Sequence, residues 1–209
     1  AQPAATTPAP AVTPTPVQHV PTPFGMVPDT TLKQLTGALP VYEAQQRTNT
    51  NNVNLNFSLA TAYFQTGQTN KALNQMDRIL ANPTANAQTL RTLATGYQSL
   101  GQIGKLETTV ARLVMVDPLN PESNYDLAVI RTAVGQNLAQ QNQATAAQQR
   151  FKMAIVTLIK AVKLSDNRRA TNINAADLRA LALKDTRIQV LHTTPLFQKE
   201  IGIPASVKQ

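Results

Sequence analysis

The sequence contains no cysteine and no tryptophan, and it has only two histidines among its 209 residues. Without cysteine there is no disulfide framework, no thiol nucleophile and no thiolate metal site. The two histidines, His19 and His192, lie near opposite ends of the chain, which argues against a histidine metal site or a Ser-His triad. No apolar run approaches the ~20 residues that a membrane-spanning helix needs. These absences argue against most hydrolytic and metal-dependent chemistries.

Other signatures of catalysis are also missing from the sequence. No glycine-rich phosphate loop follows a strand pattern, and no strand pattern is evident in the chain. The eleven carboxylates are scattered along the sequence. We therefore expect a protein that is not an enzyme, with no catalytic, cofactor-binding or metal-binding residues and with no cofactor.

The first 28 residues contain no charged residue but hold eight of the fourteen prolines. Each proline fixes its own φ and biases the preceding residue towards extended conformations, so this stretch is predicted to be an extended, polyproline-like arm. Four threonines precede a proline, as in O-glycosylated stalks, with a plain linker as the alternative interpretation. These candidate O-glycosylation sites are Thr7, Thr13, Thr15 and Thr22.

The sequence begins with Ala-Gln-Pro-Ala and not with methionine. This beginning resembles the mature end that removal of a secretory signal leaves, and a trimmed sequence is the alternative. The composition is also rich in Thr, Asn and Gln and poor in charge. We therefore expect a secreted protein, either extracellular or periplasmic.

The net charge of +8 is concentrated in the last third of the chain, where residues 150–209 hold eleven Lys and Arg against four acids. A basic surface can bind nucleic acid, an anionic glycan, a membrane surface or an acidic partner. Phe151 and Phe197 are the only aromatic residues there, so no base-stacking platform is expected and nucleic acid is not favoured. Solvated helix faces are the simpler interpretation of this charge.

From residue 53 the sequence repeats with a period of 34 residues. Each unit has a Leu-Ala pair, then a large residue one helical turn later, then a glycine. The recurring residues are Leu59-Ala60, Tyr63 and Gly67; Leu93-Ala94, Tyr97 and Gly101; and Leu127-Ala128, Arg131 and Gly135. Small alanines let two helices approach closely, and a glycine in the left-handed conformation ends the first helix. Apolar residues at helical spacing then predict a second helix, which a proline ends.

These units resemble the tetratricopeptide repeat (TPR) family over about residues 53–166, with a degenerate third repeat. The resemblance implies an all-α fold, a short α-solenoid of about three TPR-like helix pairs. In the third unit an insert at 136–149 displaces the second helix, and it either extends a helix or forms a loop. Asn56 and Asn124 stand where the family prefers a large apolar residue. Asn56 also opens an Asn-Phe-Ser glycosylation sequon, which we discount because it falls on a predicted helix.

Short helical caps are predicted on both sides of the repeats. In the first, Asp29 is expected to cap a helix that Gly37 ends. In the second, a helix is expected to begin at Asn174, because a repeat array needs a terminal element to cover its last apolar face. The predicted organisation is an extended arm at 1–28, short helices and a loop at 29–52, the repeats at 53–166, and a C-terminal helical cap and tail at 167–209.

In repeats of this kind the first helix of each pair lines a concave face, so the resemblance implies a groove for a peptide. The residues expected there are Asn54, Phe57, Thr61 and Phe64; Gln88, Arg91, Thr95 and Gln98; and Glu122, Tyr125, Val129 and Thr132. The family's cluster of basic residues for a terminal carboxylate is not expected, because these positions include one Arg and one Glu. A neutral polar groove with three aromatics suits an extended, uncharged peptide.

The N-terminal arm fits that description of a ligand. The sequence therefore predicts a non-enzymatic protein–protein interaction and structural subunit of a secreted or envelope assembly, self-assembling through its arm into a closed oligomer or a filament. Its expected partners are other copies of itself or subunits of a larger complex. The alternative is a monomeric periplasmic TPR adaptor that binds an extended peptide of a partner protein.

Overall fold

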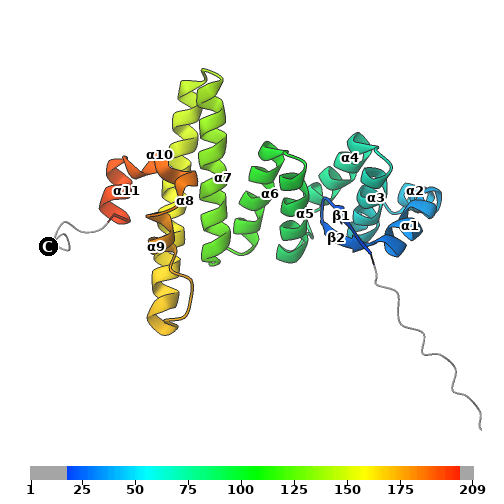
Figure 1. The fold of residues 1–209 in the computed structure, drawn as a ribbon, viewed down its shortest axis with the longest axis horizontal. Helices are drawn as coiled ribbons and strands as arrows, with labels where there is room; N and C mark the ends of the chain where they lie inside the picture. The colour runs from blue at the N-terminus through cyan, green and yellow to red at the C-terminus, as the bar shows by residue number, and fades with distance from the viewer. Residues whose placement is uncertain (1–17, 203–209) are drawn as a thin grey trace, which may run out of the picture.

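The computed structural model describes residues 18–202, and these residues form an all-α solenoid with one small hairpin (Figure 1). Three helix pairs stack side by side, and short helices flank them, as the sequence predicts. The pairs are α3 (Val53–Gln65) with α4 (Thr69–Ala81), α5 (Ala87–Ser99) with α6 (Ile103–Val116), and α7 (Pro121–Gln140) with α8 (Ala144–Thr171). The flanking elements are β1 (His19–Thr22), β2 (Gly25–Pro28), α1 (Asp29–Gly37) and α2 (Leu39–Thr48) before the pairs, and α9 (Leu178–Ala182), the 3-10 helix η1 (Thr186–Ile188), α10 (Gln189–His192) and α11 (Pro195–Glu200) after them.

An asparagine begins the first helix of every pair, again with a period of 34 residues. The side chains of Asn52, Asn86 and Asn120 each accept a hydrogen bond from a backbone N–H in the first turn, at 3.0, 2.9 and 2.8 Å. Such a cap satisfies one of the N–H groups that a helix start leaves without a partner. The first two of these helices end at Gly67 and Gly101, whose φ angles of 74° and 65° confirm the expected left-handed glycines.

The repeat tyrosines connect each of the first two pairs to the helix that precedes it. The Tyr63 hydroxyl donates to Glu43 at 2.6 Å, and the Tyr97 hydroxyl donates to Asp77 at 2.7 Å. In both cases the acid stands 20 residues before the tyrosine. Burial, followed by the hydrogen bond to Glu43, raises the pKa of Tyr63 to about 12. The hydroxyls therefore stay protonated donors at neutral pH.

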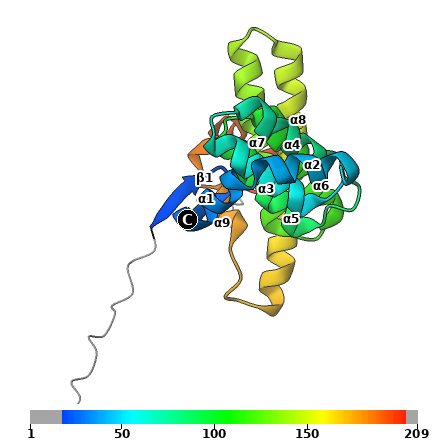
Figure 2. The same cartoon turned by 90° about the vertical axis from the view of Figure 1, so that its right-hand side faces the viewer.

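The third pair departs from the expected pattern at Gly135, which does not end a helix. This glycine is buried inside α7, where an added Cβ would lie 2.6 Å from the Phe151 ring of α8. The reversal comes later, at Asn142, whose φ is 61°. The insert at 136–149 thus lengthens both helices into a hairpin that projects beyond the other pairs (Figures 1 and 2).

Asn56 and Asn124, which stand where the family prefers a large apolar residue, are buried. Each binds the backbone of the loop that precedes its helix. The Asn56 amide donates to the Thr50 carbonyl at 3.0 Å, and the Asn124 amide donates to the Pro118 carbonyl at 3.3 Å. Each acceptor lies six residues before its asparagine. Asn56 is only 1% exposed, so the sequon lies in the core of a helix pair.

The N-terminal segment corrects two expectations. Residues 19–28 form an antiparallel hairpin with His19 opposite Pro28 and Thr22 opposite Gly25, whereas the sequence showed no strand pattern and predicted a polyproline-like arm. The polyproline-like conformation and the β-strand both have an extended backbone, and the hairpin packs on the helices that follow it. Asp29 is the first residue of α1 and not its cap, and its carboxylate pairs with Lys33 at 2.8 Å. Residues 1–17 lie outside the described part of the chain.

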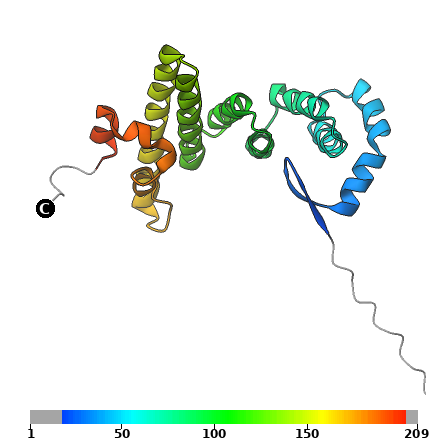
Figure 3. The ribbon, with the colours of Figure 1, turned by 45° about the horizontal axis from the view of Figure 1, so that its top comes forward.

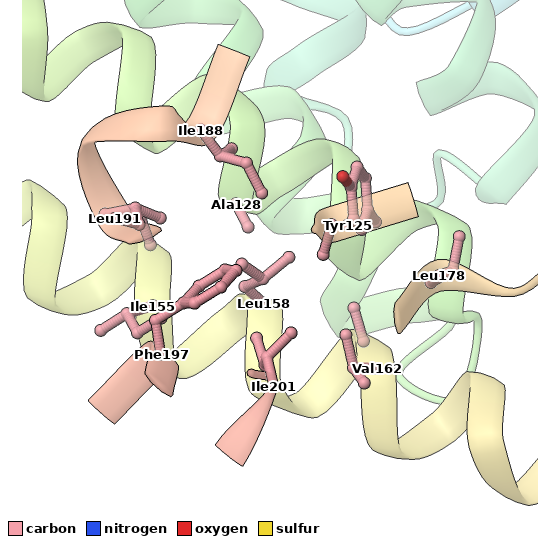
Figure 4. Close-up of a cluster of buried hydrophobic side chains, with 13 residues drawn as sticks. Tyr125, Ala128, Ile155, Leu158, Val162, Leu178, Ile188, Leu191, Phe197 and Ile201 are labelled. Atoms are coloured by element: carbon pink, nitrogen blue, oxygen red, sulfur yellow. The ribbon is translucent and has the colours of Figure 1, made fainter. Parts of the chain in front are cut away.

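The C-terminal helices cover the last apolar face, as expected for a solenoid cap. Ile188, Leu191, Phe197 and Ile201 pack on Leu158 and its neighbours in α8 (Figure 4). The first helix of this cap begins at Leu178 and not at Asn174. Asp177 is its N-cap and accepts from the Ala180 N–H at 2.9 Å, whereas the Asn174 N–H donates to Asn172 in a turn.

Candidate functional site

The inner side of the curve from α1 to α5 is occupied by the chain's own β1–β2 hairpin (Figure 3). The ring of Phe24, in the hairpin turn, meets the ring of Phe57 edge to face with centroids 5.2 Å apart. Gly96 of α5 leaves room for Phe24, because a Cβ there would lie 2.5 Å from the Phe24 ring. Phe57 is a predicted groove residue, so an uncharged segment of this chain fills the first part of the predicted groove.

Polar side chains of the first two pairs bind the hairpin backbone. The Gln65 side-chain amide donates to the Pro21 carbonyl at 3.2 Å, and the Ser99 hydroxyl donates to the Pro23 carbonyl at 3.0 Å. This is the ligand chemistry expected for the groove, namely an extended segment with free carbonyls. The contact is made within one chain, and docking of this segment onto another copy stays a prediction.

The second part of the groove is an open pocket of about 310 Å³ between α5, α6 and α7. Its floor is apolar and its rim is polar and charged. The floor is formed by Ala94, Leu106, Val110, Leu113, Val129 and Ile130, and the rim by Arg91, Thr95, Gln98, Asp126 and Arg187. An apolar floor with a few polar groups around it is the usual composition of a binding pocket.

The structure brings together only some of the twelve residues predicted to line the groove. Those that line the pocket are Arg91, Thr95, Gln98 and Val129. Asn54 and Gln88 are exposed at the start of their helices, and Phe64 packs on the core of the first pair. Glu122 is partly buried and pairs with Arg168.

Three predicted groove residues are buried and do not line a groove. Thr61 and Thr132 turn their hydroxyls onto backbone carbonyls of their own helices, Phe57 and Ala128, at 2.9 Å in both cases. Tyr125 is 2% exposed and donates to Asp185 at 3.0 Å. In the third unit the C-terminal cap therefore covers part of the face that the resemblance assigned to a ligand.

Two rim residues were not predicted from the sequence, Asp126 and Arg187. Asp126 lies one turn after Glu122 on α7, so the pair of acids was visible in the sequence as an i, i+4 spacing. Arg187 comes from the cap, more than fifty positions away, and no sequence pattern connects it to the pocket. Desolvation by burial raises the pKa of the Asp126 carboxyl, and the charge of the nearby Arg187 partly offsets this.

The arginines at the rim are each held by an acid. Arg91 pairs with Asp117 at 3.2 Å, and Arg187 pairs with Asp185 at 2.6 Å. The hydrogen bonds from Arg187 hold the pKa of Asp185 at about 2. With these partners the rim carries little net charge, which favours an uncharged ligand.

Ion pairs neutralise part of the basic charge of the C-terminal third. Among the ten Lys and Arg side chains of residues 150–202, six pair with an acid: Arg150, Lys163, Arg168, Arg169, Arg179 and Arg187. Of the candidate glycosylation sites, only Thr22 falls in the described residues, and its hydroxyl donates to the Gly25 carbonyl at 2.7 Å. Thr7, Thr13 and Thr15 lie outside them.

Among residues 18–202, no helix combines the length and the apolar character that a membrane span requires. Within the same range, no group of three or more His, Asp or Glu side chains is arranged to hold a metal ion.

Comparison with known proteins finds a likeness in structure but none in sequence family. No family model matches the chain, and no curated protein matches it. Among solved structures, the crystal structure of MamA is similar with a TM-score of 0.38 and 14% sequence identity, over 77% of this chain and 88% of that one.

Proposed function

We propose that this protein is a non-enzymatic protein–protein interaction subunit that binds an extended, uncharged peptide in the pocket between α5, α6 and α7. The observation that carries the proposal is the chain's own hairpin. An extended, uncharged segment already lies on the adjoining part of the same face, held through its carbonyls by Gln65 and Ser99. The open pocket also lies against α5 and has the neutral polar residues Thr95 and Gln98 on its rim.

We also propose that the helix pairs are tetratricopeptide repeats. The 34-residue period supports this, because it governs the capping asparagines and the first two helix-ending glycines as well as the Leu-Ala pairs. A solenoid of this kind presents a concave face made of successive first helices, which is where the pocket lies.

A variant that fills the pocket tests the proposed site. Thr95 is exposed on α5, so Thr95→Trp places a large ring in the pocket without replacing a core residue. Linear peptides selected from a displayed library on the wild-type protein should lose binding to Thr95→Trp. Asn74→Trp, at an exposed position on α4, is the matched control and should bind them normally. If the selected peptides bind Thr95→Trp as well as the wild type, the pocket is not the peptide site.

A second candidate function is self-assembly, with residues 1–17 of one copy as the peptide that another copy binds. These residues have the composition of the hairpin segment, rich in Pro and Thr and without charge. Deleting residues 1–17 leaves the hairpin in place, so it removes only the proposed ligand. Light scattering should then show fewer copies per particle for the truncated protein than for the full chain. The same number of copies for both proteins would contradict assembly through residues 1–17.

We propose a secreted or envelope location for this subunit, on the strength of its composition alone. Cell fractionation of the native protein, with cytosolic and periplasmic markers, tests this part. Recovery with the cytosolic marker would contradict it without affecting the peptide site.

A further inference from the structure

A second cleft lies on the other side of α6 from the concave pocket. The α6 residues that line the pocket are Leu106, Val110 and Leu113, whereas those that line this cleft are Glu107, Ala111 and Met115, about half a turn around the helix. The cleft has a volume of about 610 Å³ and is open along α6, α7 and α8. We call it the arginine–methionine cleft, after Arg112, Met115, Arg131, Arg150 and Met153.

The cleft has more positive than negative charge. Three arginines line it, and Glu107 is the one acid among its lining residues. Glu107 is 8% exposed and forms ion pairs with two of these arginines, with Arg150 at 3.1 Å and with Arg131 at 3.6 Å. The third, Arg112, donates to the backbone carbonyls of Leu80 and Asn82 at the end of α4, which carry no full charge.

Arg131 is largely buried and only partly satisfied. Its side chain is 16% exposed and its Nη1 donates to the Thr157 hydroxyl at 2.5 Å, but its buried Nε has no hydrogen-bond partner within the described residues. Burial, followed by the repulsion of Arg150, lowers the pKa of the Arg131 guanidinium, although Glu107 opposes this. A further carboxylate in the cleft would reduce this cost, because a desolvated guanidinium gains from an added opposite charge.

Two methionines stand beside the arginines. Met115 is 81% exposed and Met153 is 39% exposed, which is unusual for side chains of this size and polarity. Methionine adapts its shape to an apolar partner, and both methionine and arginine are enriched in protein interfaces. The cleft therefore combines an anion-binding feature with an apolar one.

We propose that the arginine–methionine cleft is a second protein-binding site, and that its occupant is an acidic, apolar segment of a partner protein. A carboxylate of that segment lies towards Arg131 and Arg150, and an aliphatic side chain lies between Met115 and Met153. The site is independent of the concave pocket, which faces the other way and favours an uncharged ligand.

Three labelled peptides test this pairing of charge and apolar contact by fluorescence anisotropy on the full chain. The first has Glu and Leu separated by Gly-Ser spacers, the second has Lys in place of Glu, and the third has Ser in place of Leu. The Glu–Leu peptide should bind saturably and at least about fivefold more tightly than either of the others, since a contact of about 1 kcal/mol corresponds to that factor. Equal binding of all three, or no saturable binding of the first, overturns the proposal.

Matched variants locate the binding on the molecule. Met115→Gln and Arg150→Gln should each weaken the Glu–Leu peptide by about fivefold. Val156→Gln and Lys152→Gln change exposed residues of α8 that do not line the cleft, and they should leave binding unchanged. Met115→Gln alters a side chain that contributes little to the core, so its result stands even if Arg150→Gln loosens the fold.

Comparing the Glu–Leu peptide with inorganic polyphosphate, as competing ligands of the same protein, separates binding at this site from general attraction of anions to a basic protein. If inorganic polyphosphate binds as tightly as the Glu–Leu peptide and Met115→Gln weakens neither, the surface attracts anions without an apolar contact and the proposal is wrong. Thr95→Trp should bind the Glu–Leu peptide normally. Failure of the concave site and failure of this cleft are therefore distinguishable.

Discussion

Replacing Asp185 by Asn should destabilise the protein at neutral pH and much less at acidic pH. Asp185 lies in the C-terminal cap and joins three groups. It accepts from the Tyr125 hydroxyl of α7, from the Arg187 guanidinium, and from the Arg187 backbone N–H within η1. Its side chain is only 5% exposed, so these bonds form largely out of contact with solvent.

The size of the effect follows from the depressed pKa. The folded pKa of Asp185 is about 2, against an ordinary value of 3.8. A difference of this size corresponds to about 2 kcal/mol of folding free energy above pH ~5, where Asp185 is ionised in both states and the folded state stabilises its charge more strongly. The contribution is lost as the pH falls from about 4 towards 2, and about half of it remains near pH 3.

Urea denaturation of the wild type and Asp185→Asn at pH 7 and pH 3 measures this contribution. The difference in the free energy of unfolding between the two proteins should decrease by about 1 kcal/mol from pH 7 to pH 3. Tyr125→Phe is the control, because it removes one hydroxyl without changing a titrating group and should show a gap of about 1 kcal/mol that changes less with pH. An equal gap for Asp185→Asn at the two pH values would refute the assignment of the charge interaction.

Three further predictions concern the repeat and its hairpin. Gly101→Ala should cost about 1–2 kcal/mol in a denaturant titration because of the positive φ at Gly101, whereas Gly104→Ala, at an open helical position, should cost nothing. Asn120→Ala removes a cap and should cost about 1 kcal/mol in the same assay. Gly96→Ala should push Phe24 from its site, cost about 1–3 kcal/mol and make the hairpin cleavable by protease at a concentration that spares the wild type.

The repeated helix pairs could be predicted from the sequence because their determinants are local. Gly67 and Gly101 lie at fixed distances from the Leu-Ala pairs, and the structure confirms them as left-handed helix ends. The asparagine caps recur with the same period. They were readable in the sequence as well, although Asn52 looked like part of a loop among other asparagines.

The features that were wrong depend on contacts between distant residues. Gly135 occupies the position of a helix-ending glycine, but Phe151 packs directly on it and α7 continues. The hairpin was missed because Phe24 is fixed by Phe57 and Gly96, which lie far along the chain. A proline-rich segment alone indicates only extended backbone. Whether it pairs as a strand depends on the surface against which it packs.

The C-terminal cap contributes to the candidate site as well as to stability. Arg187 lines the concave pocket, and its guanidinium is held by Asp185, which in turn holds Tyr125 in the core of the last pair. Asp185→Asn therefore removes the fixed partner of a rim arginine in addition to a stabilising charge. On our proposal, Asp185→Asn should weaken peptide binding at pH 7 without urea, where the variant remains folded. Tyr125→Phe leaves the Arg187 pair intact and should not weaken peptide binding. Peptide affinity that follows stability in both variants would show that the cap supports the fold alone.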